Sequence, residues 1–182
     1  TPEGFAAFLK DPPYKGFDRQ LTAEALRVQA MRVANTSRKS LDNIRLLGQE
    51  KTFAVTTGHQ LCLFTGRLNY IYKSATAISL AKKLSEQFRD RDFVPVYWMA
   101  SEDHDFAEIN HLQTFDRKVV WESAQTGAVG RFRTEELKKV VPAIEETFGN
   151  SEKGNELSDL FRKSYLEHKN LADATRFLVN AL

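Results

Sequence analysis

Two short apolar segments decide the fold, FAVTT at residues 53–57 and FVPVYWMA at residues 93–100. Both are rich in β-branched or aromatic residues and largely lack a polar face, which is typical of buried parallel strands. Glycines stand at positions 58 and 66, and residues 68–88 have the apolar spacing of a helix without an internal Gly or Pro. The order strand, glycine turn, helix, strand predicts a βαβ unit with a right-handed crossover.

The expected crossover helix carries a broad apolar stripe, and we expect this stripe to face the core. Its members are Leu68, Ile71, Tyr72, Ala75, Ile78, Ala81, Leu84 and Phe88. We interpret Trp98 and Trp121 as core or interface aromatics.

Helical spacing also predicts a helix over residues 18–47, with a candidate bend at residues 35–37 and Gly48 as the C′ residue. After the βαβ unit the pattern changes. Three short strands are expected, at residues 111–115, 119–122 and 127–132, with a hairpin turn at Asp116-Arg117.

The last part of the chain is expected to be helical. Thr134 is a candidate N-cap for a helix over residues 135–148, and Pro142 should kink that helix. Residues 149–154 read as a polar loop, and residues 157–182 as a helical hairpin.

The composition excludes several classes of protein. A hydrophobic fraction of 42% can build a core, and 26 basic against 24 acidic residues leave a net charge of +2, which does not indicate binding to nucleic acid or to an anionic membrane. One cysteine, Cys62, excludes an internal disulfide and a cysteine-based zinc site. With no signal peptide and no apolar run of about 20 residues, we expect a soluble, cytosolic protein. Because the chain starts at Thr1 and ends in an apolar-striped helix, we expect the rest of a fold to be missing.

The first candidate site follows the first strand. Thr57, Gly58, His59 and Gln60 stand at its carboxyl end, where open α/β sheets bind ligands, and Gly66 lies just before the crossover helix. The free N–H groups of a helix start suit a phosphate or a carboxylate. The residues fit either such a site or a plain glycine turn whose histidine caps the helix.

The second candidate site follows the second strand. Glu102, Asp103, His104 and Asp105 are consecutive, with Glu108 close behind, so they should share the same edge of the sheet. Three carboxylates and an imidazole repel one another unless a cation or hydrogen-bond donors compensate. Candidate uses are Mg²⁺ binding, recognition of a substrate ammonium or general-base catalysis, and the alternative is a solvated acidic loop.

Two polar residues open the crossover helix. Lys73 lies one turn after Asn69 and could reach a bound anion, or it could simply be solvated.

Together these segments resemble the bacillithiol biosynthesis cysteine-adding enzymes. The resemblance runs through residues 56–73 (TTGHQLCLFTGRLNYIYK), 94–110 (VPVYWMASEDHDFAEIN) and 127–131 (GAVGR). It implies a Rossmann-like core similar to that of class I aminoacyl-tRNA synthetases, with connective insertions and a helical coiled coil that forms a homodimer. The implied reaction joins L-cysteine to glucosaminyl malate by ATP-dependent amide formation, with Mg²⁺ as a candidate cofactor. Partners would then be these small molecules and a nucleotide, with neither nucleic acid nor membrane.

The resemblance also implies an organisation. The fold class is α/β, with a partial Rossmann-like parallel βαβ core, flanking helices and a small β-rich insertion. The expected parts are a helical segment at 1–50, the core at 51–110, the β insertion at 111–133 and a helical segment returning to the core at 134–182. Family members are much longer, so this chain would be an amino-terminal portion that is inactive alone.

Residue roles follow from the same resemblance. It implies catalytic roles for His59, Asp103, His104 and Asp105. It places residues 58–60 in a nucleotide-side loop and residues 102–105 on the cysteine or sugar-amine side. With the strand-end and helix-start residues described above, the expected nucleotide- or substrate-binding residues are Thr57, Gly58, Gln60, Gly66, Asn69, Lys73 and Glu102, and no residue is assigned to a metal. Many members carry Gln at the position of His59.

Two other functions fit the residues. One is a metal-dependent phosphohydrolase that uses Asp103, His104 and Asp105 with His59. The other is a non-catalytic nucleotide-binding or interaction module, in which helices at 18–47 and 155–182 pair with partners.

Overall fold

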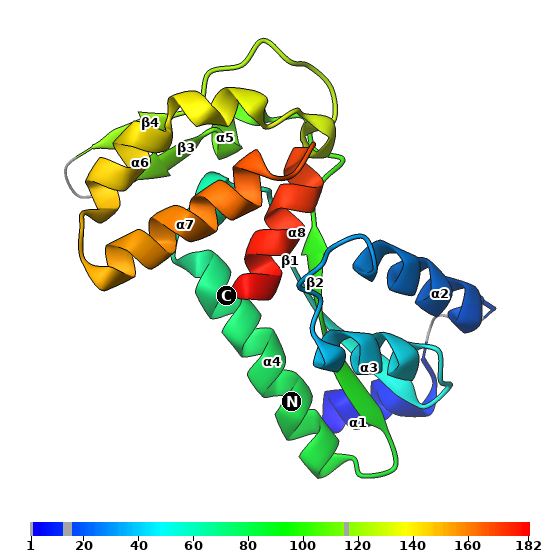
Figure 1. Ribbon diagram of the computed structural model, residues 1–182. Coiled ribbons are helices and arrows are strands. Elements are labelled where there is room, and N and C mark those ends of the chain that lie inside the picture. The colour runs from blue at the N-terminus through cyan, green and yellow to red at the C-terminus, as the bar shows by residue number, and fades with distance from the viewer. Residues whose placement is uncertain (1, 13–15, 115–116) are drawn as a thin grey trace.

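The computed structural model describes residues 2–12, 16–114 and 117–182 (Figure 1). Its α-helices are α1 (Pro2–Lys10), α2 (Arg19–Ala30), α3 (Arg38–Leu47), α4 (Asn69–Gln87), α5 (Phe106–Ile109), α6 (Val141–Phe148), α7 (Glu152–Leu166) and α8 (Leu171–Ala181). Its strands are β1 (Thr52–His59), β2 (Asp92–Met99), β3 (His111–Gln113) and β4 (Lys118–Val120). Short 3-10 helices are η1 (Leu63–Thr65), η2 (Val129–Arg131) and η3 (Glu135–Lys139).

The predicted βαβ unit is confirmed, and with it the α/β class. β1 and β2 pair in parallel over their whole length, from Thr52 opposite Asp92 to His59 opposite Met99. α4 crosses between them and packs on one face of the sheet, where Ala81, Leu84 and Phe93 form a small core. Figure 1 shows α4 on one side of the strands and α2 and α3 on the other.

The apolar stripe expected on the crossover helix is only partly right. Ala81 and Leu84 are buried as predicted, but the other buried residues of α4 are Tyr70 and Ala77. The prediction that Tyr72 lies in the core is wrong, because its side chain is 66% exposed. The stripe is wider than one helix face, so its first half points away from the sheet. Its exposed large members are Leu68, Ile71, Tyr72 and Ile78.

Residues 18–47 form two helices instead of one bent helix. Ser37 ends the linker and caps α3, since its side chain accepts the N–H of Ser40 at 3.1 Å. Gly48 follows α3 as expected, but its φ of −70° is right-handed, so it does not adopt the left-handed C′ conformation. A Cβ at position 48 would lie 3.3 Å from the Gln20 side chain, which indicates that Gly48 lets α2 approach closely.

Most of the core lies beyond the sheet, where β3, β4 and α5 to α8 pack together. Among its fully buried side chains are Trp121, Phe161 and Tyr165. β3 and β4 form an antiparallel hairpin, as predicted, although Phe115 and Asp116 of the expected strand end and turn lie outside the described residues. The C-terminal helical hairpin is confirmed as α7 and α8.

Three local predictions in this region are wrong. The strand expected at 127–132 is the 3-10 helix η2. Thr134 stands at the N-cap position of η3, but its side chain does not cap the helix: it is buried, and its hydroxyl donates to the carbonyl of His168 at 2.6 Å. Pro142 does not kink a helix but stands in the first turn of α6, where its missing N–H costs nothing.

The loop expected at residues 149–154 is shorter than predicted. Ser151 caps α7 by accepting the N–H of Gly154 at 3.0 Å, so Gly154 is already helical. Within the described ranges, no helix combines the length and the apolar character needed to cross a bilayer.

Candidate functional site

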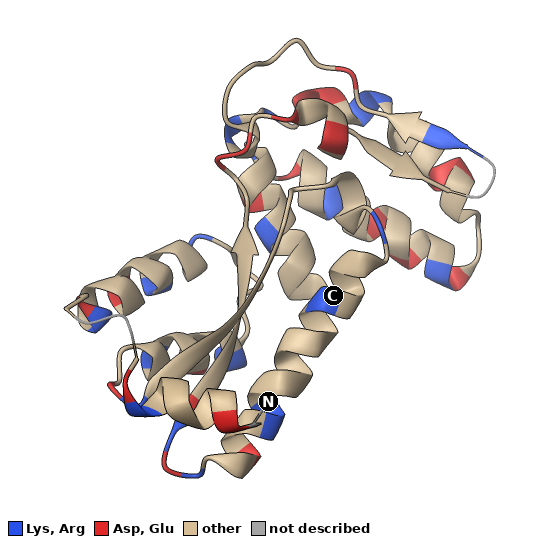
Figure 2. Cartoon of the chain, turned by 180° about the vertical axis from the view of Figure 1, so that it is seen from behind, with Lys and Arg blue, Asp and Glu red and all other residues tan. Residues whose placement is uncertain are grey.

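The carboxyl ends of β1 and β2 bring the two candidate segments together. The backbone N–H of Ala100 donates to the carbonyl of His59 at 3.2 Å, which extends the strand pairing past Met99. One residue further, the side-chain amide of Gln60 donates to the carboxylate of Glu108 at 3.2 Å. The TGHQ segment and the acidic segment therefore touch through side chains as well as through the backbone. Figure 2 shows acidic residues on the turn and on α5, which follow β2.

Two carboxylates of the acidic segment hold its own backbone. One oxygen of Asp103 accepts the N–H groups of His104 at 2.7 Å and Asp105 at 3.1 Å. The hydrogen bond from Asp105, followed by that from His104, keeps the pKa of Asp103 below its ordinary value. Asp105 in turn caps α5, since its side chain accepts the N–H of Glu108 at 3.1 Å.

The other two residues of the segment point to solvent. Glu102 is exposed and makes no hydrogen bond or ion pair within the described residues. The His104 side chain is 90% exposed, with its ring 3.8 Å from the Asp103 carboxylate. Glu102 and His104 are thus the members best placed to contact a ligand.

Residues 127–131 support this turn from behind. The N–H groups of Val129 and Gly130 donate to the carbonyls of Asp103 at 2.7 Å and Ser101 at 2.9 Å. A Cβ on Gly130 would lie 2.6 Å from the Ser101 Cβ and 2.7 Å from its carbonyl oxygen. Only glycine at position 130 allows this contact without a shift of the backbone.

His59 lies at the end of β1 on the sheet face covered by α4. Its ring centroid is 5.8 Å from that of Tyr70, which in turn packs edge-on against Tyr97. Burial, helped by the positive charge of Lys73 and opposed by Glu108, lowers the pKa of His59. Its Nε2 is buried and has no hydrogen-bond partner in the described part of the chain. Both observations favour the neutral imidazole over its protonated form.

Lys73 reaches back from α4 to the end of β1. Its ammonium donates to the carbonyl of Gly58 at 3.0 Å, so it is not simply solvated, and no acidic side chain within the described ranges pairs with it. Asn69 is exposed at the first position of α4, and no side chain caps this helix start at Leu68. Thr57 is half-buried within β1.

The loop between β1 and α4 is held in an unusual conformation. Phe64 and Thr65 have φ of 50° and 68°, and Gly66 has φ of 66°. The phenol oxygen of Tyr165, fully buried on α7, accepts the N–H of Phe64 at 2.8 Å. Sequence reasoning missed this role of Tyr165, because nothing near position 165 points to a loop far away in the sequence.

Of the two alternatives for the tryptophans, core or interface, Trp121 is a core residue and Trp98 is not. Trp98 is 59% exposed, on the sheet face opposite α4, whereas Trp121 is 1% exposed. A Cβ on Gly58 would lie 3.7 and 3.8 Å from the Cβ and Cδ1 of Trp98, so the indole lies beside a position without a side chain. Residues 94, 96 and 98 share the face that α4 does not cover, yet Val94 is 1% exposed, so the strand pattern alone could not reveal the exposure of Trp98.

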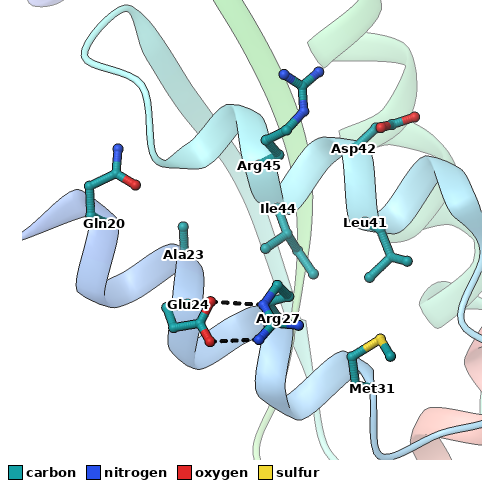
Figure 3. Close-up of a pocket in the computed structure, with 9 residues that line it drawn as sticks. All are labelled: Gln20, Ala23, Glu24, Arg27, Met31, Leu41, Asp42, Ile44 and Arg45. Carbon is teal, nitrogen blue, oxygen red and sulfur yellow. Dashed lines mark hydrogen bonds and ion pairs between the residues drawn. The ribbon is translucent and has the colours of Figure 1, made fainter.

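A cavity of about 430 Å³ lies away from the strand ends, between α2 and α3. In Figure 3, Leu41 and Ile44 of α3 face Ala23 of α2 across it, and the ion pair of Glu24 with Arg27 stands at its rim. None of the predicted site residues lines this cavity. Across residues 2–12, 16–114 and 117–182, no three His, Cys, Asp or Glu side chains gather in a way that could hold a metal ion.

Comparison with known proteins matches the whole chain to one family. The model of the bacillithiol biosynthesis BshC N-terminal Rossmann-like domain covers residues 1–182. This agrees with the resemblance carried by the TGHQ and SEDHD segments and with the Rossmann-like fold class.

Individual relatives give the same result. The chain is 45% identical over 174 residues to a protein of Flavobacterium psychrophilum, covering 95% of the chain and 33% of that protein. It is 41% identical over 184 residues to one of Flavobacterium johnsoniae (94% and 35%) and 39% identical over 186 residues to one of Christiangramia forsetii (99% and 34%). All three are named "Putative cysteine ligase BshC". The chain spans about a third of the length of these relatives.

Proposed function

Because the chain belongs to the BshC family of bacillithiol biosynthesis through its N-terminal Rossmann-like domain, we propose that it supplies the substrate site of a cysteine ligase. The proposed reaction joins L-cysteine to glucosaminyl malate at the expense of ATP. The observation that carries the proposal is the hydrogen bond between Gln60 and Glu108. It joins the segment that follows β1 to the segment that follows β2 in one candidate site.

Amide formation determines what the site at the ends of β1 and β2 must do. The carboxylate of cysteine must first become an acyl phosphate, with release of ADP from ATP, or an acyl adenylate, with release of diphosphate. The amine of glucosaminyl malate then attacks the acyl carbon, phosphate or AMP leaves, and a base takes the proton of the amine. Positioning and charge neutralisation supply most of the rate in such a reaction.

Different residues suit different parts of this task. The uncapped start of α4 and the nearby Lys73 offer positive charge for a nucleotide or a carboxylate. The exposed Glu102 and His104 can meet the ammonium groups of the substrates. A neutral His59 has the protonation state of a proton acceptor. Asp103 and Asp105 act by holding the turn.

Mg²⁺ would fit here only in a limited way. Because no three protein donors gather among the described residues, the ion would be held mainly by nucleotide phosphates and by one or two carboxylates such as Glu102. A phosphohydrolase built on Asp103, His104 and Asp105 is disfavoured for a related reason. The carboxylates of Asp103 and Asp105 already accept hydrogen bonds from backbone N–H groups. A cytoplasmic homodimer is part of the proposal.

The activity test uses the full-length protein that carries this chain, with ATP, L-cysteine and glucosaminyl malate. We expect mass spectrometry to detect the amide product, and isothermal titration to show binding of all three substrates. We expect no turnover by the 182 residues alone. Absence of product from the full-length protein with all three substrates would refute the proposal, and its presence with the 182 residues alone would refute the need for the remaining chain.

Variants of Asp103 separate support of the turn from chemistry. Asp103→Asn keeps an oxygen that can accept the two N–H groups, whereas Asp103→Ala does not. If Asp103 holds the turn, the Asn variant should retain most activity and the Ala variant should lose most of it. Equal loss in both variants would assign the negative charge itself a part in the reaction.

Asp105→Ser is the matched test at the helix cap. Serine keeps the capping oxygen without the charge, so activity should survive in this variant and fall in Asp105→Ala. Glu102→Gln should lower activity even though no contact within the described residues is lost.

A further inference from the structure

The loop that joins β1 to α4 is anchored in the C-terminal helices. Leu61 and Leu63 are buried in the main core, in the same cluster as side chains of α6, α7 and α8. The ring of Phe64 packs against Phe148 of α6 and Phe161 of α7, with ring centroids 5.3 and 5.9 Å apart. The loop at the end of the sheet therefore depends for its shape on helices that lie far along the chain.

The backbone of this loop adopts a conformation that most side chains disfavour. Phe64 and Thr65 both have positive φ, of 50° and 68°, and Thr65 is β-branched, a residue type that rarely adopts this conformation. Such a backbone persists only where the surrounding structure imposes it, and such positions cluster at functional sites. The hydrogen bond from the N–H of Phe64 to the hydroxyl oxygen of Tyr165, at 2.8 Å, holds the backbone directly.

Candidate site residues lie on both sides of this loop. Gln60 precedes it, and its side chain donates to Glu108 at 3.2 Å. Lys73 follows it on α4, and its ammonium donates to the carbonyl of Gly58 at 3.0 Å. Because only a few residues separate β1 from α4, a change in the φ angles of the loop would move the start of α4 relative to the end of β1.

Tyr165 acts on the candidate site only through the backbone of Phe64. Its side chain is fully buried on α7, in contact with the ring of Phe161 at a centroid distance of 4.8 Å. Burial raises the pKa of Tyr165, so the phenol is neutral near pH 7 and does not serve as a base. A group at this depth does not touch a substrate at the strand ends.

We propose that Tyr165 is a positioning residue of the ligase, which fixes the end of β1 against the start of α4 through the N–H of Phe64. The inference rests on the proposed function, because it takes the ends of β1 and β2 as the place of the reaction. It assigns the helix α7 a part in catalysis in addition to its part in the core.

The kinetic test compares Tyr165→Phe with Thr134→Val in the full-length protein. Thr134→Val is the matched control, because it also removes one buried hydroxyl, which donates to the carbonyl of His168 at 2.6 Å instead of holding the loop. At a temperature where both variants are folded, Tyr165→Phe should lower kcat about tenfold and leave the KM values within about twofold. Thr134→Val should keep kcat within about twofold of the wild type. Equal kcat in the two variants would overturn the inference, because Tyr165 would then contribute to stability alone.

Hydrogen exchange separates this inference from the ligase activity. The amides of residues 58–60 and 67–73 should exchange faster in Tyr165→Phe than in Thr134→Val, since the loop no longer holds the two segments together. If exchange rises there but the wild type forms no ligase product, the proposed function fails and the support of the strand end by Tyr165 stands. If product forms but these segments exchange equally in both variants, the inference about Tyr165 fails alone.

Discussion

Trp121 and Trp98 belong to two regions that differ in how completely they are packed. Trp121 is 1% exposed and touches Phe106 and Phe132 edge to face in the main core. Trp98 is 59% exposed on a sheet of two strands, beside a glycine. The core region is closed by its own helices, whereas the strand ends keep polar and aromatic groups open. The difference indicates that stability and ligand binding depend on separate residues, and this separation can be tested.

The largest contrast is expected between the two tryptophans. Trp121→Ala should cost about 4 kcal/mol in the free energy of unfolding, because it leaves a large cavity in the core. Trp98→Ala should change it by less than about 0.5 kcal/mol, because the indole is mostly in water. Equilibrium urea unfolding followed by circular dichroism measures both. Similar losses in the two variants would contradict the division into two regions.

Gly130, beside the acidic turn, and Gly154, in α7, are two positions where a Cβ would clash with its surroundings to a similar degree. A Cβ at Gly130 would clash with Ser101, and one at Gly154 would lie 2.4 Å from the carbonyl oxygens of Phe148 and Gly149. Each change to alanine should destabilise the fold by about 2 kcal/mol. Only Gly130→Ala should also reduce ligase activity of the folded protein, because it moves the acidic turn. Thermal melting and turnover at a temperature where both variants are folded distinguish the effects, and equal activity in the two variants would count against the role of Gly130.

Tyr165 links the two regions, so its hydroxyl should have a moderate effect. Tyr165→Phe removes the acceptor for the N–H of Phe64 and should cost about 1.5 kcal/mol, because that N–H then lacks its partner. The matched control is Tyr97→Phe, whose hydroxyl has no hydrogen bond to any residue the structure describes, and it should be close to neutral. Amide hydrogen exchange should become faster in residues 63–66 of the Tyr165 variant. Unchanged exchange there would show that the loop holds its shape without Tyr165.

The smallest effect is expected from the protonation of His59. Its pKa is lowered in the folded protein, so the unfolded chain binds the proton more readily below its ordinary pKa of about 6.5. This contribution to stability is complete above that pH and is lost as the pH falls toward the pKa of the folded state. His59→Gln should therefore show a shallower loss of unfolding free energy between pH 7 and pH 5. Parallel pH profiles for wild type and variant would mean that His59 titrates normally.

Much of the fold could be predicted from local pattern. The two strands were evident because they lack a polar face, and the crossover helix because it lacks Gly and Pro. The pattern failed where tertiary contacts decide. Thr134 has the residue type of an N-cap, yet it is buried and its hydroxyl binds the carbonyl of His168. Tyr72 has helical spacing, yet the sheet covers a different face of α4.

The sequence predicted where the candidate site lies, but not what each of its residues does. Because the ends of parallel strands share an edge, the segments at Gln60 and Glu108 could be expected to meet. The sequence of the acidic segment does not reveal that Asp103 and Asp105 hold the turn, because this depends on the backbone conformation. The support from Tyr165 comes from a residue 101 positions from Phe64 in the sequence, and no local signal could reveal it.

A double-mutant cycle on Gln60 and Glu108 tests most directly whether both strand ends form one site. Each change to alanine should lower kcat/KM for glucosaminyl malate by about tenfold, as expected for the loss of one hydrogen bond to a charged group. If the two residues act together, the double variant should also lose about tenfold. A loss of about a hundredfold, the product of the two single effects, would show independent action and contradict a shared site.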